Sequence, residues 1–175
     1  MNADLPDPPA LRVVDSPVGE LVLLASAAGI TRVCFGQCSG YAVTGGKGSA
    51  QDHLIAAASQ LDAYFAGKRQ VFHLPLDVTG TQFQKSVWRQ AQLIMFAKTA
   101  AYGDIARRIG SPGAARAVGS ALGANPLPII IPCHRVVGAG GSLTGFSGGL
   151  GIKQLLLGHE AGSAPIRQSF HGSRL

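Results

Sequence analysis

The spacing of apolar residues changes near residue 78, and this change restricts the fold more than any other feature of the sequence. Before it, β-rich runs occupy 11–26, around the turn sequence Ser16-Pro17-Val18-Gly19, and 29–35, and an amphipathic helical pattern follows over 53–67. Beyond it, apolar residues recur at helical spacing. We predict an α/β domain at 1–78, a mostly helical domain at 79–162 and a flexible tail at 163–175.

The second domain contains clear helix boundaries. Thr81 with Gln84 three residues later forms a capping-box sequence, which predicts a helix from this point. A short helix over 102–110 is followed by Ser111, a good N-cap, and Pro112, a good first helical residue, which predict a second helix over 112–123. Two short helices joined by a tight turn indicate a helix-turn-helix motif. A last helix is expected over 151–162.

The formal charge of +6 is concentrated in the second half of the chain, which comprises this domain and the tail. Residues 1–80 hold five Lys and Arg against seven Asp and Glu, whereas residues 81–175 hold ten against two. This asymmetry indicates a polyanionic partner, DNA or RNA first. A basic surface without a partner would give the same count.

Composition also bears on the compartment and on metals. The sequence has no run of 18 or more apolar residues, the length needed to span a membrane. Residues 1–9 lack the features of a secretion signal. With three cysteines, an odd number, we expect a cytoplasmic protein with free thiols.

Cys34 and Cys38 could pair on a metal, but no Cys or His follows at zinc-finger spacing. We expect no catalytic metal, and a structural ion on these two thiols stays open.

The predicted helix over 112–123 carries one long cation among very small residues. On a helical wheel, one face holds Ala114, Ala115, Val118, Ala121 and Leu122, and the opposite face holds Arg116, Gly119, Ser120 and Gly123. The small residues would let the helix backbone approach a DNA groove closely, with Arg116 as its probe. The alternative is a helix packed on another helix, with Arg116 directed to solvent.

The sequence IIIPCHRVV, residues 129–137, places Cys133 beside His134 after three isoleucines. The isoleucines predict a buried strand that Pro132 ends in a bend. A thiol reacts as thiolate, so a nucleophilic Cys133 needs a base, and His134 could supply one. Asp104 or Glu160 could orient the imidazole, and Glu160 is the better placed. A buried structural cysteine beside a surface histidine remains an alternative.

Three long segments resemble the O6-alkylguanine-DNA alkyltransferases, also called methylated-DNA–protein-cysteine methyltransferases. They are GTQFQKSVW, AYGDIARRIG and GAARAVGSALGANPLPIIIPCHRVVGAGGSLTGFSGGLGIKQLLLGHE, and together they cover 80–160 almost without gaps. The resemblance implies a ribonuclease H-like first domain, with a small antiparallel sheet and a helix, and a winged helix-turn-helix-like second domain. It implies no cofactor and double-stranded DNA containing alkylated guanine as the partner.

The resemblance also implies catalytic roles by position. Cys133 corresponds to the alkyl acceptor, His134 to the base that takes the thiol proton through a bound water, and Glu160 to the acid that orients His134. Asn125 corresponds to the residue that ties the turn before the cysteine to the helix-turn-helix. Tyr102 corresponds to a tyrosine that helps to rotate the target phosphate and donates toward guanine N3.

Further positions correspond to contacts with DNA and with the extruded base. Arg116 corresponds to an arginine that fills the gap left by the flipped nucleotide. The expected DNA contacts are Arg116, Ala115, Gly119, Ser120 and Tyr102. The expected base pocket consists of Ser147, Phe146, Val136 and Cys133.

The resemblance therefore implies irreversible, single-turnover transfer of an alkyl group from O6-alkylguanine to Cys133, with O4-alkylthymine left open. We expect a stand-alone monomeric repair protein, and cooperative assembly on DNA stays open. Phe146 replaces the usual tyrosine, and Met95 lies where the family has the proline of Ile-Pro-Tyr-Gly. Three alternatives are a non-catalytic lesion binder, a DNA-binding regulator with a redox-sensing cysteine, and an unrelated thiol hydrolase.

Overall fold

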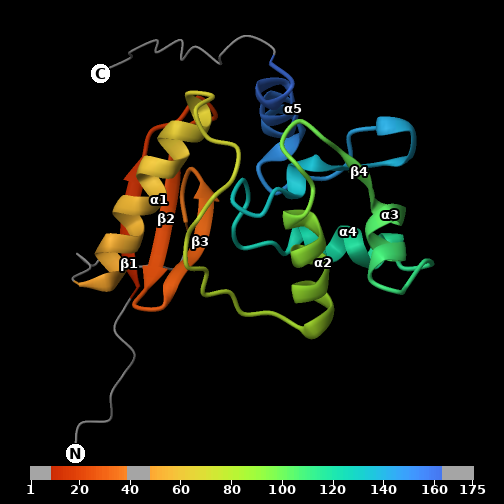
Figure 1. Ribbon diagram of the computed structural model, residues 1–175, viewed down its shortest axis with the longest axis horizontal. Helices are drawn as coiled ribbons and strands as arrows, with labels where there is room; N and C mark the ends of the chain where they lie inside the picture. The colour runs from red at the N-terminus through yellow and green to blue at the C-terminus, as the bar shows by residue number, and fades with distance from the viewer. Residues whose placement is uncertain (1–8, 39–47, 163–175) are drawn as a thin grey trace, which may run out of the picture.

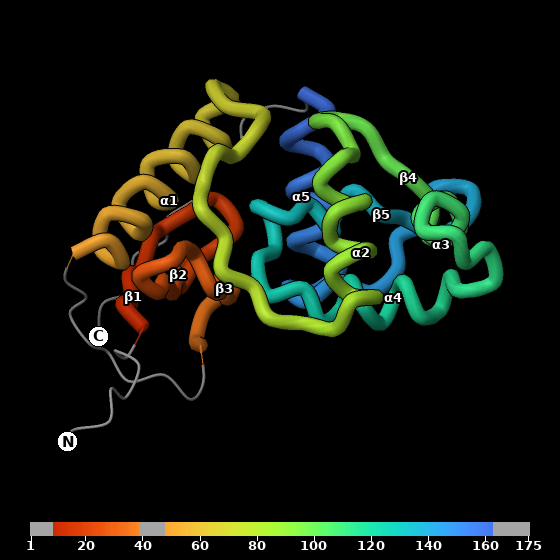
Figure 2. Tube along the Cα trace, turned by 60° about the horizontal axis from the view of Figure 1, so that its bottom comes forward, coloured from red at the N-terminus to blue at the C-terminus, as the bar shows by residue number. Residues whose placement is uncertain are grey.

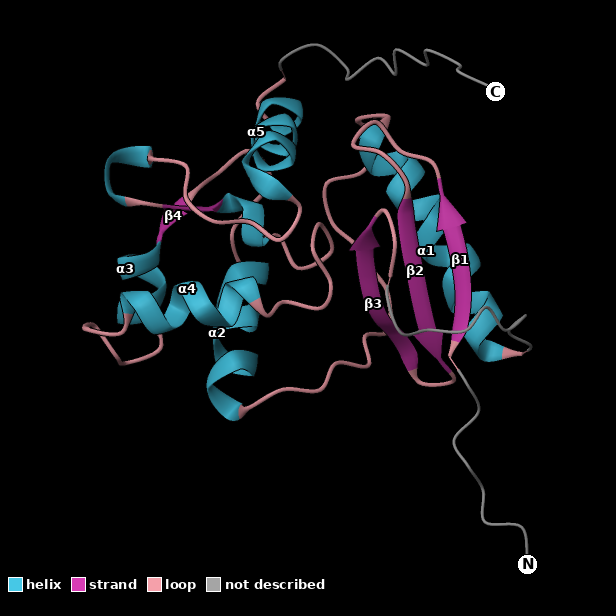
Figure 3. Cartoon of the chain, turned by 180° about the vertical axis from the view of Figure 1, so that it is seen from behind, coloured by secondary structure: helices cyan, strands magenta, loops and turns pink. Residues whose placement is uncertain are grey.

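The computed structural model describes residues 9–38 and 48–162, and its first unit is a three-stranded antiparallel sheet covered by one helix (Figure 1). The strands β1 (Ala10–Val14), β2 (Leu21–Ser26) and β3 (Gly29–Phe35) lie in the order β1-β2-β3. The predicted hairpin and third strand are therefore confirmed. Helix α1 (Ser49–Phe65) crosses one face of this sheet, as Figure 3 also shows from behind.

The core of the first unit lies between β2 and α1. Leu21, Leu23 and Ala25 alternate along β2 and are fully buried, as are Leu54 and Leu61 of α1. Helix α1 begins at Ser49, four residues before the predicted start. Its N-cap is Gly48, which has no side chain to accept a hydrogen bond from the first turn. The sequence therefore lacked the usual capping residue that would have marked this start.

The second unit is mostly helical and packs beside the first (Figure 2). It contains α2 (Gln82–Gln92), α3 (Tyr102–Arg108), α4 (Ala115–Gly123) and α5 (Gly149–Glu160). Two short strands, β4 (Ala100–Ala101) and β5 (Val136–Val137), pair in parallel. The predicted capping box is present: Thr81 Oγ1 accepts from the Gln84 N–H at 3.2 Å, and Gln84 Oε1 accepts from the Thr81 N–H at 2.9 Å.

Helix α4 starts at Ala115, three residues after the predicted start at Pro112, and Ser111 is not its N-cap. Ser111 instead completes the end of α3. Gly110 has a φ of 73°, and the N–H groups of Ser111 and Gly110 donate to the carbonyls of Ala106 and Arg107. This is the Schellman arrangement, which occupies Ser111 in ending one helix and delays the start of the next.

The prediction of free thiols is wrong for two of the three cysteines. Cys34 and Cys38 form a disulfide, and their Cα atoms are 5.6 Å apart. The chain turns after β3 at Gly36, whose φ of 68° reverses its direction and brings the two residues together. The pairing also replaces the structural metal that was left open at these positions. Among the described residues, Cys133 is the free cysteine.

The tail at 163–175, which the sequence predicted to be flexible, and residues 1–8 lie outside the residues that the structure describes. Within 9–38 and 48–162, no helix has the length and apolar character needed to cross a membrane. In the same ranges, no cluster of three or more His, Cys, Asp or Glu side chains could hold a metal ion.

Candidate active site and DNA-facing helix

A compact buried turn, rather than the predicted strand, leads to Cys133. The three isoleucines are buried as expected, but Ile129 has a φ of 74° and the chain folds back on itself. The Ile131 N–H donates to the Leu127 carbonyl at 2.8 Å, and Asn125 Nδ2 donates to the Ile131 carbonyl at 2.9 Å. The side chain of Asn125 thus holds the turn closed, which a strand pattern could not predict.

Cys133 opens a single 3₁₀ turn, η1 (Cys133–Arg135), and is only 5% exposed. Asn125 Nδ2 also donates to its Sγ, at 3.1 Å. Burial raises the pKa of the thiol, while the Asn125 hydrogen bond and the charge of Lys153 lower it in part. The group therefore rests as a thiol and needs a base before it can act as a nucleophile.

His134, which follows Cys133 in η1, forms a buried pair with Glu160. His134 Nε2 lies 2.8 Å from Glu160 Oε1. Burial alone would raise the pKa of Glu160, but hydrogen bonds from His134 and Arg135 lower it to about 2. Burial lowers the pKa of His134, and Glu160 only partly opposes this.

The tautomer of His134 follows from these directions. Because Glu160 is a carboxylate and can only accept, Nε2 of a neutral His134 must carry the hydrogen. Nδ1 then has a free lone pair, and this buried atom has no hydrogen-bond partner among the described residues. The imidazole is therefore prepared to take a proton at Nδ1.

Of the two acids considered from the sequence, only Glu160 faces His134. Asp104 accepts from the Ala101 N–H at 2.8 Å and pairs with Arg107, so it holds the first turn of α3. A carboxylate in the first turn of a helix stabilises that helix end. Glu160 is the last residue of α5 and is buried, which agrees with its choice from the sequence as the better placed acid.

Two charged residues of the site were not assigned these contacts from the sequence. Arg135 donates to Glu160 through Nε, at 2.9 and 3.1 Å to its two oxygens, and through Nη2 at 2.9 Å. Lys153 is fully buried, and its Nζ donates to the carbonyls of Val136 and Thr144 at 2.7 and 2.8 Å. Lys153 and Glu160 are seven residues apart on α5, two helical turns, which could have indicated that they share a face.

A cavity of about 440 Å³ lies between the helix pair formed by α3 and α4 and the loop before α5. It brings together Phe146 and Ser147 of the predicted base pocket with Tyr102, Ala115 and Gly119 of the predicted DNA contacts. Gly123, Thr144 and Gly145, which were in neither predicted set, complete its lining. One wall of the cavity contacts the His134–Glu160 pair, which we call the relay. The Phe146 ring packs edge-on against the His134 ring, with centroids 6.5 Å apart. The Phe35 ring of the first unit packs against the Phe146 ring, with centroids 5.6 Å apart.

Two predicted pocket residues, Cys133 and Val136, are not among those that line this cavity. Val136 is fully buried in β5, and its carbonyl already accepts from Lys153. A second cavity of about 300 Å³ shares Gly123 and Ser147 with the first and is lined by Asn125. Asn125 thus lines this second cavity and also contacts the Cys133 sulfur, although Cys133 itself does not line it.

Helix α4 presents three faces rather than the two predicted from the wheel. Val118, Ala121 and Leu122 are buried, and Arg116 and Ser120 are exposed. Ala115 and Gly119 lie between them and line the first cavity. A Cβ added to Gly119 would lie 3.7 Å from the Tyr102 ring, so this glycine adjoins the tyrosine instead of facing outward.

The fold and the site together define a class of protein: a helix-turn-helix unit that carries a buried cysteine beside a histidine–glutamate pair. Family models identify it further. Residues 11–78 match the ribonuclease-like domain of 6-O-methylguanine DNA methyltransferase, and residues 82–162 match the DNA binding domain of the same family. The chain belongs to the 6-O-methylguanine DNA methyltransferase family.

Individual relatives agree. A methylated-DNA–protein-cysteine methyltransferase of Mycolicibacterium paratuberculosis is 45% identical over 154 residues, covering 88% of this chain and 93% of the relative. One from Methanosarcina acetivorans is 42% identical over 83% of this chain and 94% of its own length. The crystal structure of Mycobacterium tuberculosis OGT in complex with DNA has a TM-score of 0.80 and 42% identity, covering 89% of this chain and 95% of that one.

Proposed function

We propose that this protein repairs O6-alkylguanine in double-stranded DNA by moving the alkyl group irreversibly to Cys133. The observation that carries the proposal is the buried Cys133–His134–Glu160 cluster beside a cavity lined from the helix pair, in a chain of this family. The DNA complex of the Mycobacterium tuberculosis relative supports DNA as the partner.

The geometry supports a two-part reaction. His134 accepts the thiol proton at Nδ1, in the family through a bound water, and Glu160 stabilises the resulting imidazolium. The sulfur then forms a bond to the alkyl carbon while the carbon–O6 bond breaks, and its electron pair leaves with guanine. The guanine regains neutrality by accepting a proton, for which Tyr102 is the proposed donor. The thioether product has no leaving route, so each molecule acts once.

Access to the thiol explains why the base must leave the duplex. Cys133 is buried, and the O6 substituent is hidden in the base stack. The cavity beside Tyr102, Phe146 and Ser147 would hold the extruded base, and the exposed Arg116 of α4 would fill the space that it leaves.

The intact-protein mass tests this function. After mixing with a duplex that contains one O6-methylguanine, the protein should gain the mass of one methylene unit, with one duplex consumed per protein. Peptide mapping should locate the gain on Cys133, and Cys133→Ala should show none. Tight binding to the damaged duplex without a gain in mass would identify a lesion binder instead and overturn the proposal.

Arg116→Ala should slow transfer from duplex DNA by about 10- to 100-fold, because base extrusion costs a few kcal/mol and the arginine offsets part of that cost. Transfer from the free base O6-benzylguanine, which needs no extrusion, should be unchanged. Arg12→Ala, which removes an exposed arginine from β1, provides the control for loss of charge. Equal loss on duplex and free base would contradict the assigned role.

A further inference from the structure

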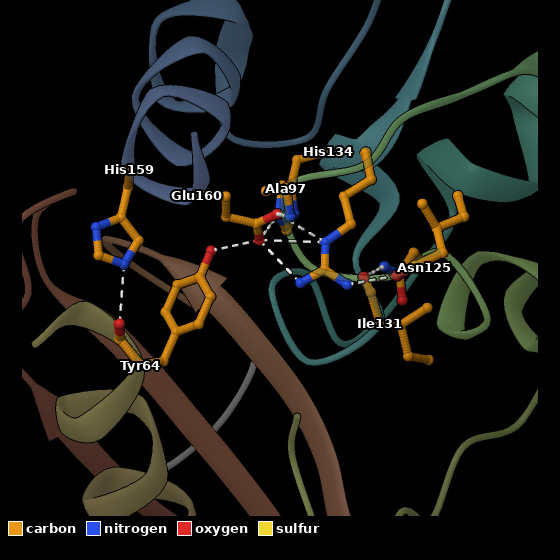
Figure 4. Close-up of polar contacts among 9 residues, drawn as sticks. Tyr64, Ala97, Asn125, Ile131, His134, His159 and Glu160 are labelled. Atoms are coloured by element: carbon orange, nitrogen blue, oxygen red, sulfur yellow. Dashed lines mark hydrogen bonds and ion pairs between the residues drawn. The ribbon is translucent and has the colours of Figure 1, made fainter. Parts of the chain in front are cut away.

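The carboxylate of Glu160 is also contacted from the first unit of the protein, by a residue of α1. Tyr64 Oη donates to Glu160 Oε1 at 2.8 Å, across 96 residues of sequence. Tyr64 is fully buried, and Figure 4 shows its hydroxyl directed at Glu160. Neither the assigned catalytic roles nor the proposed reaction uses this contact.

Tyr64 is fixed so that its hydroxyl stays on Glu160. Its backbone carbonyl accepts from His159 Nε2 at 2.8 Å, so one residue of α1 binds two consecutive residues of α5 (Figure 4). Its ring packs edge-on against the His159 ring at 5.1 Å and also contacts Phe65, Phe72 and Phe96. Burial and the nearby Glu160 charge raise the pKa of Tyr64, so the phenol remains protonated and always donates.

Tyr64 and His134 share one acceptor atom. Glu160 Oε1 accepts from Tyr64 Oη and lies 2.8 Å from His134 Nε2, and it also faces Arg135. Glu160 Oε2 accepts from the Ala97 N–H at 3.0 Å and from Arg135. A carboxylate oxygen offers about two lone-pair sites, so each additional donor reduces the negative charge available to the others.

We propose that Tyr64 is a positioning residue for alkyl transfer, whose hydroxyl fixes Glu160 and limits the negative charge that Glu160 presents to His134. This inference rests on the proposed function, since it concerns the same relay. It gives the first unit a part in the chemistry: α1 adjusts how readily His134 becomes charged.

The other groups around Glu160 define what must stay constant in a test. From η1 these are His134 and Arg135, with Cys133 preceding them. From α5 they are His159, bound to the Tyr64 carbonyl, and the buried Lys153, whose charge acts on His134. Tyr64→Phe removes only the hydroxyl and leaves all of these in place.

Single-turnover transfer by Tyr64→Phe, measured from pH 5 to pH 9 with DNA in excess, tests the inference. Without the hydroxyl, more of the Glu160 charge acts on His134, which raises the pKa of the imidazole. The acidic limb of the rate profile should therefore move up by about half to one pH unit, with up to about a tenfold loss of rate on that limb and little loss at high pH. Affinity for DNA should not change.

A packing control separates this role from a purely structural one. Phe72→Leu disturbs the contact with the Tyr64 ring without removing a polar contact to Glu160. It should lower stability and leave the acidic limb in place. The titration of the His134 ring, followed by NMR, should show the same upward shift in Tyr64→Phe without relying on transfer.

An unchanged limb and an unchanged His134 titration in Tyr64→Phe would overturn the inference, as would an equal shift in Phe72→Leu. A wild-type protein that fails to transfer at any pH would instead overturn the proposed function, so the two failures can be told apart.

Discussion

Glu160→Gln is expected to lower the free energy of unfolding by about 3–5 kcal/mol at pH 7, the usual cost of removing one partner of a buried ion pair. Glu160 is 3% exposed and Arg135 5% exposed, so the substitution leaves a guanidinium charge buried without its carboxylate. The neutral amide also brings two N–H donors into a position where every neighbour is a donor.

The same substitution should slow alkyl transfer by at least about tenfold, less than the roughly 100- to 10,000-fold that a whole general base contributes, because the His134 imidazole itself remains. The amide oxygen of the glutamine would turn to Arg135, and its NH₂ group would then face His134 Nε2. His134 would have to accept at Nε2 and carry its hydrogen on Nδ1, the atom proposed to take the thiol proton. Affinity for DNA should change little, because Glu160 lies far inside the protein.

The loss of stability in Glu160→Gln should become smaller at low pH. The folded-state pKa of Glu160 is about 2, below its ordinary value of 4.5, so its stabilising effect is complete above pH 4.5 and is lost as the pH falls toward 2. The stability difference between wild type and Glu160→Gln should therefore shrink over this interval. Urea unfolding at pH 7 and at lower pH values measures it.

Asp104→Asn is the matched control for this measurement. Asp104 pairs with Arg107 at the surface, with side chains 38% and 66% exposed, and an asparagine oxygen can still accept from the Ala101 N–H. Such exposed pairs contribute about 0–1 kcal/mol. Equal losses in the two variants would contradict the buried-pair interpretation of Glu160.

The parts of the fold that the sequence predicted are those determined by neighbouring residues. The capping box at Thr81 and the hairpin around Ser16-Pro17-Val18-Gly19 form because each is completed within a few residues. The role of Ser111, in contrast, depends on more than its neighbours. Its neighbours suit an N-cap, but its N–H is used to end α3, and the competition between the two motifs is decided by the whole helix pair.

The candidate site was predictable in its residue types but not in its connections. Cys133, His134 and Glu160 were identified from the sequence, and the structure places His134 in contact with Glu160, with Cys133 as the residue before His134. The contact from Tyr64 joins residues 96 positions apart and depends on how the two units pack, so no local pattern indicates it. The Cys34–Cys38 bond was missed because an odd cysteine count and the absence of a secretion signal favoured free thiols.

The site thus depends on one carboxylate that joins several parts of the fold. Glu160 receives hydrogen bonds from α1, from η1 and from the loop after α2, where the Ala97 N–H donates to it. Ala97 has a φ of 58°, a left-handed conformation that is strained for alanine. The Ala97 N–H donates to Glu160 in this conformation, so the loop, His134 and the first unit all contact a single side chain.

Asn125→Ala is expected to lower the free energy of unfolding by about 2–3 kcal/mol, because it leaves a buried N–H without an acceptor. Asn125 Oδ1 accepts from the Leu127 N–H at 3.0 Å, and its Nδ2 holds the Ile131 carbonyl. The turn that it closes contains Ile129 with a φ of 74°, a conformation that persists only when its surroundings enforce it.

The same variant should raise the pKa of Cys133 further. Burial raises this pKa, and the Asn125 hydrogen bond is the largest of the effects that lower it. Less thiolate then forms at a given pH, so transfer should be slower and its pH midpoint higher, by about tenfold for each pKa unit. Urea unfolding and the pH profile of single-turnover transfer measure the two effects. Gln154→Ala, which removes an exposed amide from α5, should change neither. A destabilised Asn125→Ala protein with an unchanged midpoint would restrict Asn125 to closing the turn.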